Sequence, residues 1–174
     1  MKYKIILLIT CFILGNIVSV PARRKVDKET LQWRYEIEAA VGQAVQGYTL
    51  VKVYTYAKKK DLAILQAGKN AVHGILFKGI AAKNEKNIRL PSQKPIISDL
   101  DAYEKNKKYF KEFFKNGGKY QQFVQMVNNG VPDMGDIVKI KKEYKVGVKV
   151  LVAKDALRKE MENNGIIKAL DSGF

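Results

Sequence analysis

The sequence predicts an α/β (α+β) fold with one mixed sheet of about four to six strands and helices packed on one face. Two segments, residues 48–56 and 136–153, are rich in the β-branched and aromatic residues that favour strands. Between them, residues 61–80 begin as an alanine-rich helix and end as a short apolar run. A helix that leads into a strand must pack on the sheet which that strand joins. The predicted order is therefore strand, strand, helix, strand, helix, strand, strand, helix.

Residues 1–22 have the pattern of a secretory signal peptide. Two lysines precede an apolar run over residues 5–20, and the Val-Pro-Ala sequence that ends at Ala22 suits a cleavage site. The run is shorter than the roughly 20 residues that span a membrane as a helix. An uncleaved N-terminal anchor is the alternative. We therefore expect cleavage near Ala22 and export to a periplasmic or outer-membrane-associated location.

The composition indicates one basic, exported domain. We expect a basic, flexible N-terminus at residues 23–31 and a single globular domain at residues 32–174. Cys11 is the only cysteine and lies within the predicted signal peptide, so the mature domain has no disulfide. The chain has 32 Lys and Arg against 17 Asp and Glu, a formal net charge of +15. This charge favours anionic partners such as membrane headgroups or glycans, and export argues against nucleic acid as the partner. The alternative is that the lysines only make the protein soluble.

Two strands are predicted ahead of the central helix. Apolar and charged residues alternate from Gln32 to Ala39, which is typical of a strand with one exposed face. That face carries Glu36 and Glu38, a carboxylate pair that we interpret as forming surface ion pairs rather than a glycosidase site. Residues 48–56 are apolar or β-branched on both faces, as expected for a central strand.

The central helix has a predicted start at Asp61, whose side chain can cap the first turn. Gly74 is predicted to end the helix in the left-handed conformation, and residues 75–80 to form a short buried strand. His73, the only histidine, has no cysteine or second histidine nearby, so we interpret it as a helix-end residue rather than a metal ligand or catalytic base. The helix is expected to pack through one apolar face and a stripe of alanines: Leu62, Leu65 and Val72, and Ala63, Ala67 and Ala71.

The second half of the domain contains a predicted loop, two helices and further strands. Residues 81–95 lack periodicity and are expected to form a long surface loop, which favours partner contacts. Residues 120–127 fit either a helix or a strand, and we prefer the strand. The last helix is predicted over residues 155–163, with an Asp cap. Another helix begins at residues 98–101, ends at Gly117 and carries an apolar side that we assign to the core: Leu100, Tyr103, Phe110, Phe113 and Phe114.

Residues 136–153 supply the main candidate binding surface. Even positions are mostly apolar and several odd positions are lysines, with a turn or bulge at Lys142 and Glu143. We expect the apolar side chains to face the core and the lysines to form one basic surface: Lys139, Lys141, Lys145 and Lys149. A second candidate group consists of three lysines just ahead of the central helix: Lys58, Lys59 and Lys60. Their positive charge opposes the helix dipole, and either a bound anion would offset this charge or water would screen it.

Four segments resemble small envelope proteins of Bacteroides-type bacteria: residues 50–56, 70–77, 144–150 and 157–160. The broader layout resembles the fold shared by the curli secretion-channel subunit, the lipoprotein activators of penicillin-binding proteins and the N-terminal domain of TolB. The resemblance implies a non-enzymatic component that works through protein contacts, often in oligomers. The sequence departs from that group in having no convincing lipoprotein signal and no long amphipathic hairpin that could line a pore. The resemblance therefore transfers a fold and a general role, and no functional residues.

These observations predict no catalytic residue, no metal and no cofactor. The preferred function is that of an exported, non-enzymatic structural or adaptor subunit of a bacterial cell-envelope assembly. Its partners would be other envelope proteins or further copies of the same chain. The alternative is a periplasmic module that binds an anionic glycan or lipid through the lysine-rich strand face.

Overall fold

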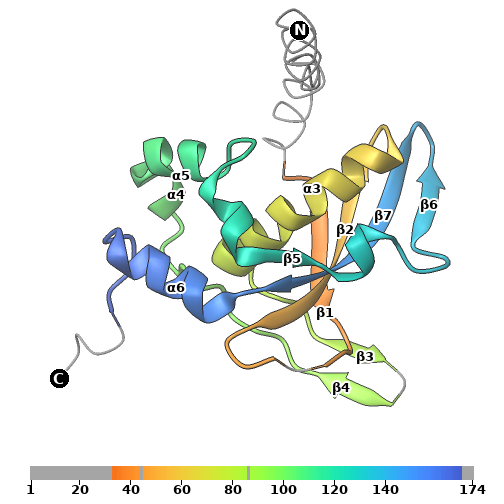
Figure 1. The fold of residues 1–174 in the computed structure, drawn as a ribbon, viewed down its shortest axis with the longest axis horizontal. Helices are drawn as coiled ribbons and strands as arrows, with labels where there is room; N and C mark the ends of the chain where they lie inside the picture. The colour runs from red at the N-terminus through yellow and green to blue at the C-terminus, as the bar shows by residue number, and fades with distance from the viewer. Residues whose placement is uncertain (1–32, 44, 86, 170–174) are drawn as a thin grey trace, which may run out of the picture.

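The computed structural model of the protein describes residues 33–43, 45–85 and 87–169 (Figure 1). The fold is α+β, as predicted, and consists of a five-stranded sheet with helices on one face and at one end. The predicted signal peptide and basic N-terminus lie outside the described residues. Among the residues that are described, none of the helices combines the length and the apolar character that crossing a membrane requires.

The sheet has the strand order β1-β2-β7-β5, and β6 also pairs with β7. These strand pairs are all antiparallel. β2 and β7 pair along their whole common length, from Thr49 opposite Val152 to Ala57 opposite Tyr144. The predicted central strand at residues 48–56 is therefore confirmed. The bounds of the strands are β1 Tyr35–Ala39, β2 Thr49–Ala57, β5 Val124–Met126, β6 Ile137–Ile140 and β7 Glu143–Val152.

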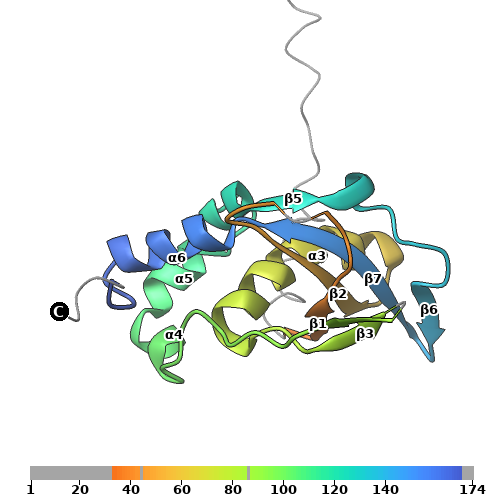
Figure 2. The same ribbon diagram turned by 90° about the horizontal axis from the view of Figure 1, so that it is seen from below.

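Helix α3, Lys60–His73, lies across one face of the sheet (Figure 2). Its alanine stripe is fully buried, because short side chains let the helix backbone lie close to the sheet. The predicted stripe is thus confirmed. Two other predictions are wrong: Leu65 is 68% exposed, and Asp61 lies inside the first turn, with Lys59 at the cap position and no side-chain capping bond. The sheet meets the helix with a set of buried valines: Val51, Val53, Val146, Val148, Val150 and Val152.

The predicted strand at residues 75–80 is wrong. Gly74 keeps a right-handed helical backbone with φ −61° and ψ −47°, and the chain continues as one π-helical turn over Gly74–Lys78. The turn is stabilised by a distant segment, because the carbonyl groups of Ile75 and Leu76 accept hydrogen bonds from the N–H groups of residues 96 and 97. It ends at Gly79, whose φ of +78° favours glycine and where a Cβ would lie 2.5 Å from the Gln93 carbonyl oxygen.

Residues 81–95 are more ordered than the predicted surface loop. They contain a small hairpin of β3, Lys83–Glu85, and β4, Ile88–Leu90, which projects below the main sheet in Figure 1. The hairpin begins along the outer edge of β1, where the Ala39 N–H donates to the Ala81 carbonyl at 3.1 Å. Strands of three residues are too short to show a periodic pattern, which is why the sequence did not reveal them.

Three helices gather at one end of the molecule: α4 Ala102–Lys105, α5 Lys107–Phe113 and α6 Lys154–Asn163 (Figures 1 and 2). The predicted helix from residue 98 therefore starts later and is divided at Asn106. Leu100 precedes it and is 96% exposed, so its assignment to the core is wrong. The aromatic core prediction is confirmed for Phe110, Phe113 and Phe114, which are buried.

Two further predictions are corrected in detail. Residues 120–127 were expected to be a strand, but a 3₁₀ turn at Lys119–Phe123 comes first and β5 follows it. The last helix begins one residue early, with Ala153 at the cap position, so Asp155 lies in its first turn and does not cap it. This helix packs as its sequence predicts, because both of its apolar residues, Leu157 and Met161, are fully buried.

Candidate functional site

The strand lysines do not form the single surface that was predicted. A two-residue turn joins β6 to β7 and places Lys139 opposite Tyr144. Directly opposed residues of an antiparallel pair point to the same face of a sheet. Lys139 therefore points to the helix-covered side, whereas Lys145 and Lys149 point to the open face. The prediction failed because odd positions of one strand pair with even positions of the next across a two-residue turn.

β6 also lies outside the core. All residues of β6 are exposed, so the prediction that Val138 and Ile140 face the core is wrong. The even positions of β7 behave as predicted, since the valines from 146 to 152 are fully buried. Lys141 lies in the turn itself, with φ +54°, and is exposed. The predicted basic surface is thus divided among two sheet faces and a turn.

The two lysines on the open face are paired with carboxylates from other elements. Lys145 Nζ lies 2.7 Å from a Glu36 carboxylate oxygen, and Lys149 Nζ lies 2.7 Å from Asp133. The ammonium group of Lys145 and the hydroxyl of Tyr56 lower the pKa of Glu36 by hydrogen bonding to its carboxylate. The open face is therefore a network of matched charges rather than a positive surface.

The carboxylate pair on β1 has the role predicted for it. Glu36 pairs with β7, and Glu38 accepts a bond from Lys83 Nζ at 2.5 Å. On the neighbouring strand, Lys52 Nζ lies 2.6 Å from Asp136. Burial opposes the charge on Lys52, yet the hydrogen bond to Asp136 raises its pKa above the ordinary value. All these carboxylates are thus engaged in ion pairs.

The three lysines at the start of α3 are exposed. Lys58 and Lys59 lie at the exposed end of the strand-to-helix connection. Lys60 Nζ lies 5.3 Å from the centre of the Tyr144 ring, which is a cation–π distance. Within the described part of the chain, no group of three His, Cys, Asp or Glu side chains could hold a metal ion.

A cavity of about 780 Å³ lies between the end of α3 and the short helices α4 and α5. Trp33, which lies two positions ahead of β1, contributes one part of the wall, and Phe77 of the π-helical turn contributes another. The walls are aromatic and the rim carries charge. The lining residues are Trp33, Lys69, His73, Phe77, Leu100, Tyr103, Glu104, Lys107, Phe110, Lys111, Phe114 and Lys115.

His73 is fixed at the base of this cavity by its neighbours. Its ring stacks on Trp33 with centroids 3.6 Å apart and an interplanar angle of 16°. The Tyr35 hydroxyl lies 2.6 Å from Nδ1, a hydrogen bond that we assign with the hydroxyl as donor. Burial, followed by the positive charge of Lys78, lowers the pKa of His73 to about 3. The ring is therefore uncharged at neutral pH and serves as an aromatic wall.

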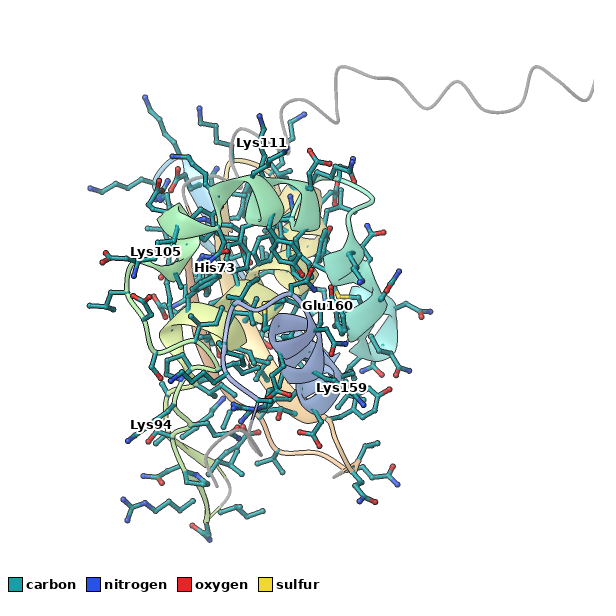
Figure 3. The ribbon with its side chains drawn as sticks, turned by 90° about the vertical axis from the view of Figure 1, so that its left-hand side faces the viewer. His73, Lys94, Lys105, Lys111, Lys159 and Glu160 are labelled. Atoms are coloured by element: carbon teal, nitrogen blue, oxygen red, sulfur yellow. The ribbon has the colours of Figure 1, made fainter. Side chains whose placement is uncertain are left out.

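The rim of the cavity is more positive than its walls. Four of the lining residues are lysines and one is a glutamate, but Lys69 is buried, so the exposed rim carries three lysines. Glu104 pairs with Lys107 at 2.8 Å, and Lys115 pairs with Glu112 at 2.6 Å. Lys111 is exposed and makes no ion pair with any described residue. Figure 3 faces this end of the molecule and places Lys111 near the outer margin and His73 further in.

The lining set offers no pair of residues for nucleophilic catalysis. Among the described residues that surround the cavity there is no serine, threonine or cysteine. The single histidine is held neutral and bonded to Tyr35, and the single carboxylate is bonded to Lys107. A serine, threonine or cysteine nucleophile with an adjacent base is therefore absent from this set.

The sequence missed this cavity because its aromatic residues were all assigned to the core. That assignment holds for Phe110 and Phe114, each of which has one side in the core and contributes to the wall. The cavity depends on the break between α4 and α5 and on the position of Trp33 ahead of β1. One signal was present: His73 and Phe77, four positions apart, continue the aromatic surface onto the helix end.

No protein-family model, curated protein or solved structure matches the chain.

Proposed function

We propose that the protein is a non-enzymatic binding protein whose aromatic cavity takes the apolar part of an amphipathic anion, with a long-chain carboxylate as the simplest member of that class. The observation that carries the proposal is the combination of one large aromatic cavity with a lysine-rich rim. Ligand pockets in proteins have volumes of about 300–1,000 Å³ and are lined mainly by apolar and aromatic side chains. The cavity matches both properties.

The walls support an apolar ligand because aromatic rings form most of them. The stacked pair of Trp33 and His73 forms one side, and Tyr103 stacks on Phe110 at 5.2 Å on another. Such rigid rings lose little conformational entropy when a ligand binds. A neutral His73 adds no charge to this surface, so a hydrocarbon chain would meet no desolvation cost there.

The rim supports an anionic headgroup. The exposed lining residues include three lysines and one glutamate, an excess of positive charge, and Lys111 has no carboxylate partner among the described residues. Lysine stems can cover apolar surface while the ammonium group stays in water, which suits the boundary between a hydrocarbon chain and its head. This proposal moves the predicted anion-binding role from the strand lysines to the helical end.

Tryptophan fluorescence gives a direct test, because Trp33 is the only tryptophan of the chain. Titration of the purified protein with sodium dodecanoate should change the Trp33 emission and release heat in calorimetry. Dodecanol, which lacks the charge, should bind more weakly, and butyrate, which lacks the chain, should not bind measurably.

Two substitutions on neighbouring helices provide a matched pair. Lys111→Glu reverses a charge on the rim and should weaken dodecanoate binding roughly tenfold, or about 1.4 kcal/mol. Lys159→Glu makes the same change on α6 at the same end of the molecule but outside the cavity lining, and should leave binding unchanged (Figure 3). If dodecanoate neither alters the Trp33 emission nor produces heat, the proposal is overturned.

We propose as a second candidate an exported structural or adaptor subunit of an envelope assembly. The N-terminal sequence supports export, and the exposed apolar edge strand β6 supports a protein partner. The N-terminal residue of the protein isolated from its own cells tests export: Arg23 is expected, and Met1 in the cytoplasmic fraction would exclude it.

A further inference from the structure

β6 is an edge strand whose outer side has no pairing partner among the described residues. It pairs with β7, and in Figures 1 and 2 it lies at the end of the molecule opposite to α4, α5 and α6. The Gly147 N–H donates to the Asp136 carbonyl at 2.8 Å, which makes these two residues a hydrogen-bonded pair. Such pairs alternate along an antiparallel ladder, so the N–H and C=O groups of Ile137 and Lys139 point away from β7. They form a free hydrogen-bonding edge.

The side chains of this strand are unusually apolar for their exposure. Ile137, Val138 and Ile140 are between 41% and 47% exposed. The segment that leads into β6 adds Val131 and Met134, which are more exposed still. Single exposed apolar residues are ordinary on protein surfaces, but a contiguous group of them marks an interaction site. Free backbone groups and apolar side chains thus coincide on one edge.

Three lysines of the same hairpin have no ion-pair partner among the described residues. Lys139, Lys141 and Lys142 are exposed and make no ion pair with any described residue. This contrasts with Lys145 and Lys149, which belong to the same hairpin and are matched by carboxylates. The unmatched lysines are the ones at the outer edge and the turn. A partner that covers this edge is therefore expected to supply carboxylates.

We propose that β6 binds an extended segment of another protein as an additional strand, and that this segment alternates apolar and acidic side chains. The free N–H and C=O groups of β6 would form the ladder, as in other cases where a peptide extends a sheet. On one face, apolar side chains of the segment would lie beside Val138 and Ile140. On the other face, a carboxylate would lie beside Lys139.

A second copy of the chain fits this edge less well. Antiparallel pairing of β6 with itself through its free hydrogen-bonding groups would bring Lys139 of one copy opposite, or two positions away from, Lys139 of the other. Like charges at such positions oppose strand pairing. Lysine on an edge strand is also a known protection against edge-to-edge aggregation. The lysine of β6 would repel a second basic strand edge but would attract an acidic strand.

The test uses a fluorescein-labelled peptide of seven residues in which valine and glutamate alternate, and the protein at low ionic strength. Fluorescence anisotropy should show saturable binding that Lys139→Glu weakens roughly tenfold or more, since it reverses the charge at the centre of the edge. Lys111→Glu, at the opposite end of the molecule, should have no effect. This control separates the edge from the proposed ligand cavity.

A second peptide distinguishes strand addition from simple charge attraction. It has the same sequence, but the backbone amides of its valines are N-methylated, so that one edge of the extended peptide cannot donate hydrogen bonds. A third peptide is N-methylated at its glutamates instead, which blocks the other edge. The peptide whose methylated amides would face β6 should lose binding, although its charge equals that of the parent peptide. The proposal is overturned if both methylated peptides bind as the parent does, or if Lys111→Glu and Lys139→Glu weaken binding equally. It is also overturned if light scattering shows a dimer of the protein that Lys139→Glu dissociates.

Discussion

The lysines of the open sheet face differ from one lysine of the cavity rim, Lys111, in how their charge is matched. Lys145 and Lys149 each lie 2.7 Å from a carboxylate that comes from a distant part of the sequence. On the rim, Lys111 has no such partner among the described residues, although its local sequence is no richer in lysine. The formal charge of +15 is therefore distributed by tertiary pairing. A row of lysines in a sequence does not locate a positive surface.

The largest effect is expected from removing the aromatic packing behind the cavity. Phe110 is fully buried, so Phe110→Ala should lower the free energy of unfolding by about 3–5 kcal/mol. Leu100 also lines the cavity but is exposed, and Leu100→Ala should change it by less than about 0.5 kcal/mol. Urea denaturation of both variants measures the difference. Similar losses in the two variants would mean that Phe110 is not a core residue.

The next effect concerns the most buried charge pair of the sheet. Lys52→Met leaves the Asp136 carboxylate without its partner 2.6 Å away and should lower stability by about 3 kcal/mol. Adding Asp136→Asn should restore a large part of this loss, because no buried charge then remains. The free energy of unfolding is again the quantity to measure. Equal stability of the single and double variants would refute the account of this pair.

Acid should weaken the aromatic end through His73. Its pKa is about 3 in the folded protein, below its ordinary value of 6.5, so the unfolded chain binds more protons between these values. The stabilisation is complete above about pH 6.5 and is lost as the pH falls towards 3. Between pH 7 and pH 5 the loss is about 2 kcal/mol.

The reference for this measurement is a variant without the titrating ring and its hydroxyl partner, Tyr35→Phe/His73→Phe. It should lose less stability than the wild type over the same pH range, and the difference belongs to His73. Among the described residues, Tyr35, Tyr103 and Lys78 are ionisable groups that face the ring. Parallel pH profiles of the two proteins would show that His73 is not buried as a neutral group.

The smallest effect is expected on the open sheet face. Lys145→Met removes an ion pair whose glutamate is 57% exposed, so its contribution to stability is at most about 1 kcal/mol. A double-mutant cycle with Glu36→Gln isolates the pair. The dodecanoate affinity should be unchanged in Lys145→Met, in Glu36→Gln and in the double variant. If Lys145→Met lost dodecanoate binding, the anion site would have to be on the open sheet face rather than at the cavity.

Features fixed by local pattern were predictable from the sequence. The alanines of α3, the alternation of β1 and the two apolar residues of α6 all pack as their spacing predicts. Features that depend on distant contacts were missed. The π-helical turn at Gly74–Lys78 is held by residues 96 and 97, and the face of Lys139 depends on the length of one turn. The cavity needed the packing of three separate segments.

The pairing of β2 with β7 determines when the protein can fold during its synthesis. The two strands are separated by a chain segment of roughly ninety residues, and such distant pairings form slowly. Until Val152 has been made, α3 lacks half of the surface that its alanines cover. The growing chain therefore stays without its central strand pair until most of the sequence has left the ribosome.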